Sequence, residues 1–145
     1  MVDLVVVGTV AYDNIKTPFG SVQDALGGSA THASFAASFF AKPGIVGVVG
    51  EDFNHVNEFE SRNISAKGLQ IAKGKTFRWS GYYEYDMHHA HTLETHLNVL
   101  ESFKPEIPAD YKNAKSLFLA NIDPALQLTI LEQMSPQLVL ADTMN

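Results

Sequence analysis

Two adjacent glycines, Gly27 and Gly28, precede a short run of small residues and His32. Adjacent glycines let the backbone approach a ligand closely and adopt positive φ angles. Ser29 is a residue type suited to the N-cap of a helix, whose first turn presents N–H groups that bind hydroxyl or phosphate oxygens. The pattern indicates either a ligand-binding helix start or a tight turn with close helix packing, which is the commoner outcome for such pairs.

An aspartate and an asparagine, Asp13 and Asn14, follow the first apolar run of the chain. If that run is a strand of an open α/β sheet, residues beyond its carboxyl end lie where such sheets bind ligands. A carboxylate can accept hydrogen bonds from two sugar hydroxyls, and an amide both donates and accepts. The alternative interpretation is an Asx turn, to which both residue types are well suited.

A group of histidines lies between positions 88 and 96. His89 and His91 would share one face of a strand and could supply two metal ligands, but no third ligand has a clear spacing. A solvated hairpin tip explains the group more simply. The sequence therefore predicts no metal site here, and it favours solvated loop charges over a cation site at Glu51 and Asp52.

The elements that must position these residues alternate between strands and helices. Short apolar runs rich in β-branched residues are typical of parallel strands buried on both faces. Their alternation with helices predicts βαβ units and a parallel sheet in an α/β core. The predicted strands are Leu4–Gly8, Ile45–Gly50, Ser116–Ala120 and Gln137–Ala141, and the predicted helices are Ser29–Ala41, Phe53–Asn63 and Ala125–Met134.

Two stretches interrupt this alternation, at about 10–26 and 75–100. They mix aromatic with polar residues, which suits strands that expose one face to solvent or to a ligand. We expect them to form a small β lid inserted in the core, with residues 1–145 as a portion of one domain. Arg78 and Trp79 in the second stretch would contact a substrate or form a dimer face, because both residue types are enriched at interfaces.

The last predicted strand lies close to the end of the chain, where a further loop and helix would be expected. A parallel sheet that ends on such a strand leaves apolar surface uncovered. The pattern therefore indicates a truncated domain.

The composition excludes several classes of protein. Sixteen acidic residues against ten basic ones give a net charge of −6, which argues against binding nucleic acid. The absence of cysteine excludes disulfides and thiol nucleophiles. No apolar run approaches the ~20 residues of a membrane helix, and no basic stretch marks a signal peptide. We therefore expect a cytoplasmic protein that has no membrane contact.

Taken together, these motifs resemble the N-terminal half of the phosphofructokinase-B (PfkB, ribokinase-like) carbohydrate kinases. The resemblance rests on Asp13, on Gly27 and Gly28 before a small-residue helix, and on the strand that ends at Gly50 before two carboxylates. It implies a Rossmann-like three-layer α/β/α core with a small β lid, which often mediates dimerisation. It also implies transfer of the γ-phosphate of ATP, with Mg²⁺, to a hydroxyl of a sugar or nucleoside.

The resemblance further assigns roles to individual residues. Asp13 would bind substrate hydroxyls, and the backbone at Gly27 and Gly28 would lie against the substrate. His32 stands where many members have an asparagine that contacts the sugar. Asn121, at a strand end, is a further candidate contact.

The second signature of that family, Asp-Thr-x-Gly-Ala-Gly-Asp, has no match, because the segment that begins at Asp142-Thr143 lacks the glycines. That signature supplies the catalytic base and the anion hole for the transferred phosphoryl group. We therefore predict no catalytic residue in this chain, and we expect ATP and Mg²⁺ to be bound mainly by a missing half. The sequence predicts the substrate-binding half of a sugar kinase, inactive by itself. The alternative is a non-catalytic small-molecule-binding or dimerisation domain derived from this fold.

Overall fold

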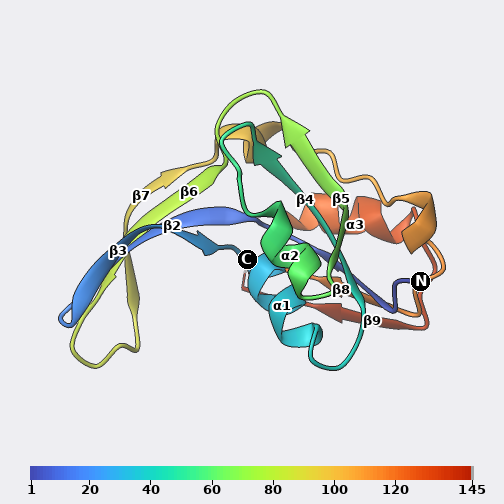
Figure 1. Ribbon diagram of the computed structural model, residues 1–145, viewed down its shortest axis with the longest axis horizontal. Helices are drawn as coiled ribbons and strands as arrows, with labels where there is room; N and C mark the ends of the chain where they lie inside the picture. The colour runs from blue at the N-terminus through green and yellow to red at the C-terminus, as the bar shows by residue number, and fades with distance from the viewer. Residues whose placement is uncertain (145) are drawn as a thin grey trace.

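The computed structural model describes residues 1–144; Asn145, which follows the Asp142-Thr143 segment, lies outside the described residues. The strands form two sheets. A five-stranded sheet with the order β5-β4-β1-β8-β9 occupies the core, and a four-stranded sheet with the order β3-β2-β6-β7 extends away from it (Figure 1). Every neighbouring pair in the core sheet is parallel, as the apolar runs predicted.

The bounds of the elements are as follows. The core sheet contains β1 (Leu4–Val7), β4 (Pro43–Gly50), β5 (Ser65–Ala72), β8 (Ser116–Leu119) and β9 (Leu138–Ala141). The four-stranded sheet contains β2 (Ala11–Thr17), β3 (Gly20–Gly27), β6 (Phe77–Tyr83) and β7 (Ala90–His96). The helices are α1 (Ser29–Ala37), α2 (Val56–Ser61) and α3 (Pro124–Leu131), with 3₁₀ turns η1 (Asn98–Ser102) and η2 (Ala109–Tyr111).

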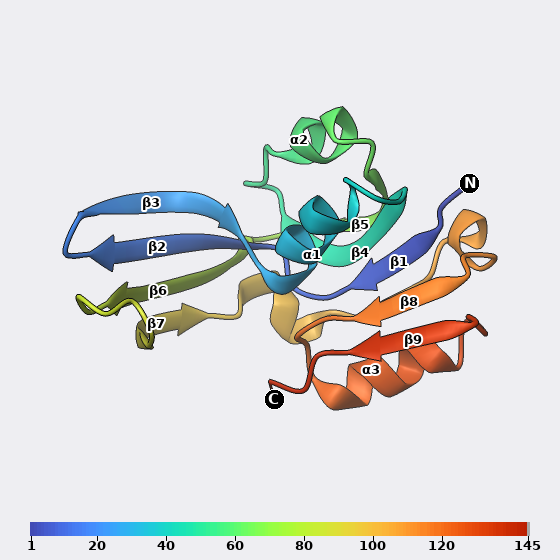
Figure 2. The same ribbon diagram turned by 90° about the horizontal axis from the view of Figure 1, so that it is seen from below.

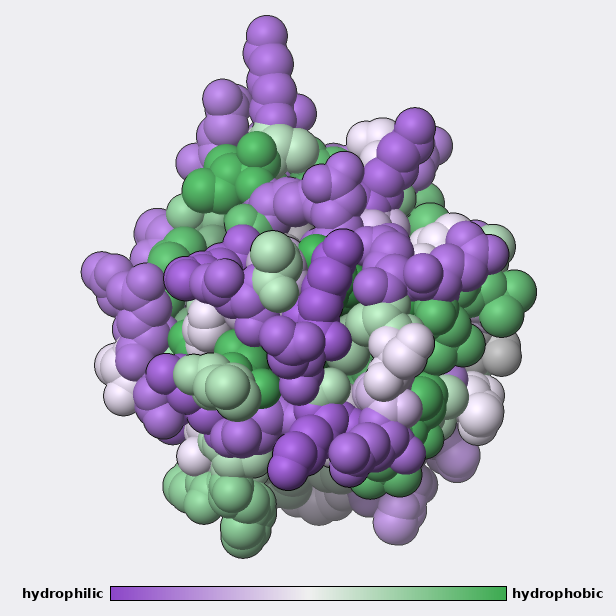
Figure 3. Space-filling model, turned by 90° about the vertical axis from the view of Figure 1, so that its right-hand side faces the viewer, coloured by the Kyte–Doolittle hydropathy of each residue, from purple (hydrophilic) through white to green (hydrophobic). Residues whose placement is uncertain are grey.

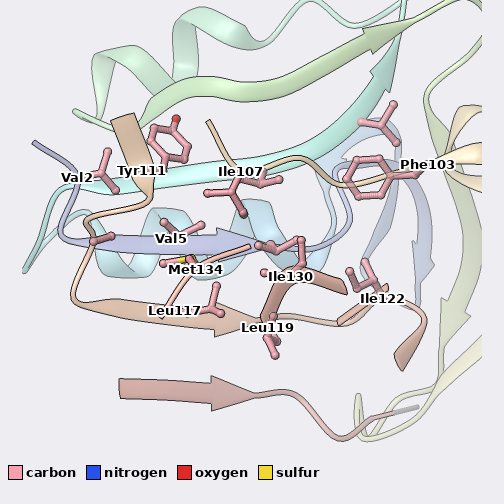
Figure 4. Close-up of a cluster of buried hydrophobic side chains, with 14 of the residues drawn as sticks. Val2, Val5, Phe103, Ile107, Tyr111, Leu117, Leu119, Ile122, Ile130 and Met134 are labelled. Atoms are coloured by element: carbon pink, nitrogen blue, oxygen red, sulfur yellow. The ribbon is translucent and has the colours of Figure 1, made fainter. Parts of the chain in front are cut away.

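The central strands of the core sheet are buried on both faces. Successive side chains of a strand point to opposite sides, and each side is covered by other elements. On one side Val5 and Val7 pack with α3 and with the segment that contains η1 and η2 (Figure 4). On the other side Val6 packs with α1 and α2. Figure 2 shows α1 and α2 on one face of the sheet and α3 on the other. The result is the expected three-layer α/β/α core.

The helices follow local sequence signals, but they are shorter than predicted. α3 begins with Pro124 at its first turn, and the Asp123 carboxylate accepts a hydrogen bond of 2.8 Å from the Ala125 N–H. α1 ends at Ala37, four residues before the predicted end, and is followed by turns.

Strand β5 was not predicted from the sequence. It pairs in parallel with β4 at the edge of the core sheet, and its residues alternate between polar and apolar types instead of forming a continuous apolar run. The ring of Tyr111 covers it: a Cβ atom at Gly44 or Gly68 would lie 2.7 or 3.1 Å from that ring. The Tyr111 hydroxyl donates a 2.7 Å hydrogen bond to the Ser65 carbonyl. Tertiary packing of Tyr111 therefore holds this strand in the sheet.

The opposite edge of the core sheet is exposed. Leu138, Val139 and Leu140 of β9 have 53%, 42% and 47% of their surface accessible to solvent. In residues 1–144, no helix has the length and apolar character needed to cross a membrane.

Candidate functional site

The strands of the core sheet point their carboxyl ends toward the four-stranded sheet (Figure 2). Polar side chains from several elements meet at this junction. The opposite end of the core presents a largely hydrophilic surface (Figure 3). A shallow pocket lies at the amino ends of the strands, where the side chains of Lys67 and Asp110 form an ion pair and neutralise each other. The junction is therefore the candidate site.

A small hydrogen-bond network joins the end of β1 to the start of α1. The Thr9 hydroxyl accepts a 2.9 Å bond from the Ser29 N–H, and the Thr9 carbonyl accepts a 2.9 Å bond from the Ala30 N–H. The Ser29 hydroxyl donates to the Asn121 carbonyl oxygen at 3.2 Å. These contacts hold β1, α1 and Asn121, two residues beyond β8, in one fixed arrangement.

The prediction that Ser29 is the N-cap of α1 is wrong. The N-cap is Gly28, which has no side chain to cap with, and Ser29 is the first helical residue. Thr9, which is distant in sequence, supplies the two oxygens that satisfy the first amides of the helix. The N–H groups of Ser29 and Ala30 are thus already occupied by protein oxygens.

Gly28 occupies a backbone position that excludes a side chain. Its φ angle is +97°, and an added Cβ would lie 2.4 Å from the Thr9 carbonyl oxygen and 2.9 Å from Cα of Val10. Both neighbours are backbone atoms, so they cannot rotate away. Glycine here allows α1 to start directly against the end of β1.

Asp13 and Gly27 face each other across the β2–β3 hairpin. A Cβ at Gly27 would lie 2.0 Å from Oδ2 of Asp13, so the missing side chain makes room for the carboxylate. Burial raises the pKa of the Asp13 carboxyl, and its electrostatic interaction with His32 partly opposes that shift. His32 is exposed in the first turn of α1. The structure therefore brings Asp13, Gly27, Gly28 and His32 together, and Asn121 is joined to them through Ser29.

Asn14 does not belong to this group. Both Asp13 and Asn14 lie within strand β2, so the Asx-turn interpretation is also wrong. The Asn14 amide donates to the Ser80 hydroxyl at 3.2 Å and accepts a 2.8 Å bond from the Asp24 N–H. Its hydrogen bonds are therefore used within the sheet, where it joins β2 to both of its neighbours.

An ionic network that sequence reasoning missed lies on the other side of β2 and β6. Arg78 forms ion pairs with Asp24 of β3 and, at 3.1 Å, with Asp52 in the loop after β4. Its guanidinium carbon lies 4.8 Å from the centre of the Tyr12 ring, in cation–π geometry. Arg78 thus connects the four-stranded sheet to the core.

Asp52, which lies in a loop as expected and has a side chain that is 28% exposed, is the core side of this connection. Its carboxylate accepts hydrogen bonds of 2.8 and 2.7 Å from the N–H and hydroxyl of Thr76. Burial by itself would raise the pKa of Asp52, but the hydrogen bonds from Thr76 and Arg78 outweigh it and lower that pKa. The sequence showed only that Asp52 and Arg78 are oppositely charged residues on two distant segments, and no pattern in it indicated that they pair.

The histidine group remains dispersed. His91 stacks on Tyr82 with ring centres 4.7 Å apart, and His96 lies 3.2 Å from the Glu94 carboxylate. Within the part of the chain that the structure describes, no three His, Cys, Asp or Glu side chains are grouped to hold a metal ion.

Comparisons with known proteins identify the fold. No family model matches the chain. It is 32% identical over 145 residues to a cytidine kinase from Thermococcus kodakarensis, covering 98% of this chain and 51% of that protein. Ribokinase from Cryptococcus neoformans var. grubii, solved with ADP, superposes with a TM-score of 0.79 at 19% identity, covering 99% of this chain and 51% of that one. A nucleoside kinase from Methanocaldococcus jannaschii superposes with a TM-score of 0.71 at 15% identity, covering 99% and 53%.

The chain therefore has the ribokinase-like fold. The resemblance drawn from its glycines and Asp13 is confirmed for the fold, and the cytidine kinase is a relative in sequence. The chain spans about half the length of the curated relative that it matches.

Proposed function

We propose that this chain forms the acceptor-binding part of an ATP-dependent sugar or nucleoside kinase. The observation that carries the proposal is the half-buried Asp13 carboxylate, which lies against Gly27 at the carboxyl ends of the core strands with His32 nearby. A carboxylate in this position accepts hydrogen bonds from two neighbouring hydroxyls of one ligand. Phosphoryl transfer depends mainly on positioning of this kind.

Each residue of the site has a role in this proposal. Asp13 binds acceptor hydroxyls, and Gly27 and Gly28 let the backbone lie close to the ligand. His32 donates or accepts one further hydrogen bond from the first turn of α1. Asn121 contributes from the end of β8. The four-stranded sheet acts as a lid whose inner face carries Asp13.

The start of α1 does not fit the phosphates of ATP. The first amides of α1, which are the natural phosphate ligands of a helix start, are bonded to Thr9. Within residues 1–144 there is also no group of three side chains that could hold a metal ion. In this proposal the described residues capture the acceptor, and the base, the anion hole and the nucleotide site belong to another part of the kinase.

Calorimetric titration of the chain with ribose and with cytidine tests the proposal. We expect Asp13→Asn to weaken binding by about 1–3 kcal/mol, roughly five- to hundredfold in Kd, because the amide accepts fewer hydrogen bonds. Asp110→Asn is the matched control, since it changes an exposed carboxylate at the opposite end of the core. Equal affinities of the wild type and Asp13→Asn would remove Asp13 from the site, and no binding of either probe would refute the function.

The same sheet has features suited to a homodimer. Phe19 and Tyr85 near its tips are 72% and 78% exposed, and Leu93 of β7 is 63% exposed. All three side chains belong to the strands or turns of one sheet, and exposed apolar side chains of this kind suit an interaction surface. Light scattering after gel filtration tests this part of the proposal: Leu93→Lys should shift a dimeric wild type toward monomer, and a monomeric wild type would refute it.

A further inference from the structure

Trp79 lies beside Asp13 on the same face of the four-stranded sheet. Asp13 in β2 and Trp79 in β6 are direct register partners on adjacent parallel strands, so their side chains point to the same side. The strands are about 4.8 Å apart. Gly27, which contacts Asp13, shows that this face is the one turned toward the start of α1. Arg78 points to the opposite face, where it lies over Tyr12. Arg78 and Trp79, for which the sequence predicted the same two roles, therefore lie on opposite faces of the sheet.

The indole ring of Trp79 is held flat against the sheet. A Cβ at Gly81, two residues along β6, would lie 2.2 Å from Cη2 and 2.3 Å from Cζ2 of Trp79, so the six-membered ring covers the Gly81 backbone. The indole N–H donates a 3.0 Å hydrogen bond to the Thr92 hydroxyl of β7. Both the plane and the direction of the ring are thus fixed, while the side chain stays only half-buried. The ring contributes a preorganised apolar surface on the same face of the sheet as the Asp13 carboxylate.

We propose that Trp79 is the platform on which a nucleobase stacks, so that the acceptor is a nucleoside and not a free sugar. This inference rests on the proposed function of Asp13. The ring extends along β6 over Gly81 and toward Thr92 of β7, so a ligand whose hydroxyls are held by Asp13 meets the ring with a group that reaches farther along this face of the sheet. The indole N–H is already bonded to Thr92, so the ring offers its flat face and not a hydrogen bond. Stacking of this kind accepts pyrimidines and purines alike, because every base has a π face.

Trp79 is the only tryptophan in the chain, so its fluorescence reports directly on this contact. Titration of the wild-type chain with cytidine should quench or shift the emission along a saturating curve. Ribose at equal concentration should leave the emission unchanged. Calorimetry with variants then measures affinity: Trp79→Leu should weaken cytidine binding about tenfold to a hundredfold, and Trp79→Phe, which keeps a flat ring, should stay within a few fold. Ribose affinity should be the same in all three proteins.

The outcomes separate this inference from the proposed function. If cytidine binding depends on Asp13 but is unchanged in Trp79→Leu, the platform is refuted and the function of Asp13 stands. If ribose binds as tightly as cytidine and perturbs the emission equally, the preference for a nucleoside is refuted. If neither probe binds the wild type, both proposals fail. Circular dichroism of Trp79→Leu excludes misfolding as the cause of a loss, and the wild-type fluorescence titration requires no variant.

Discussion

Gly28→Ala should destabilise the chain strongly, because two separate effects add at this position. The φ angle of +97° is unfavourable for a residue with a Cβ, at about 1–2 kcal/mol. The new Cβ would also lie 2.4 Å from the Thr9 carbonyl oxygen, and relief of such overpacking costs about 1–3 kcal/mol. The free energy of unfolding should therefore fall by about 2–5 kcal/mol, which lowers Tm by roughly 5–15 °C in a chain of this size.

Gly20→Ala is the matched control for this experiment. Gly20 also has a positive φ, of +152°, but no atom lies within 4 Å of the Cβ that would be added. It should therefore show only the conformational cost of about 1–2 kcal/mol. Urea unfolding followed by circular dichroism gives the free energy of unfolding of each variant. An m-value equal to that of the wild type shows that the free energies can be compared. Equal losses in the two variants would show that contact with Thr9 adds nothing at Gly28.

Three further predictions concern the site and its supports. Burial raises the pKa of Asp13, so the neutral carboxyl favours the folded state. Its contribution to the free energy of unfolding is fully present below the ordinary carboxyl pKa. That contribution is lost as the pH rises through the raised pKa. Asp13→Asn should therefore raise Tm at neutral pH and have less effect in acid, as measured by thermal unfolding across pH; a larger gain in acid would contradict this sign. Arg78→Ala removes two ion pairs and a contact with Tyr12. It should cost about 1 kcal/mol and accelerate hydrogen exchange in β2 and β6 more than in β1, and uniform exchange would contradict a junction role. The chain by itself should release no ADP from ATP and Mg²⁺ in the presence of cytidine, and substrate-dependent ADP release in a coupled assay would overturn the assignment of the base to another part of the kinase.

Much of the core could be predicted from the sequence because its signals are local. The β-branched runs of β1 and β4 have no polar position, which suits only strands covered on both sides. Pro124 suits the first turn of α3 for a similarly local reason, and in the structure Asp123 caps that turn. Strand β5 escaped prediction because its place in the sheet depends on Tyr111, which packs on it from about 40 positions away in the chain.

The candidate site also has some properties that the sequence could predict and others that it could not. The residue types of the glycine pair and of Asp13 were enough to indicate close backbone approach and hydroxyl recognition, because those properties belong to single residues. Which side chains are available depends on contacts between distant segments. Thr9 occupies the helix start in place of the expected cap at Ser29, and the Asn14 amide is used inside the sheet.

The sequence by itself therefore determined the class of fold, through apolar periodicity, and the residue types of the proposed acceptor site, through the glycines and Asp13. Only the tertiary structure decided the surroundings of Arg78 and Trp79. Adjacent residues of a strand point to opposite faces, but the sequence does not say which face meets the core loop and which meets the carboxylate. The register of β2 against β6 decides it: it places Trp79 beside Asp13 and leaves Arg78 to connect the two sheets.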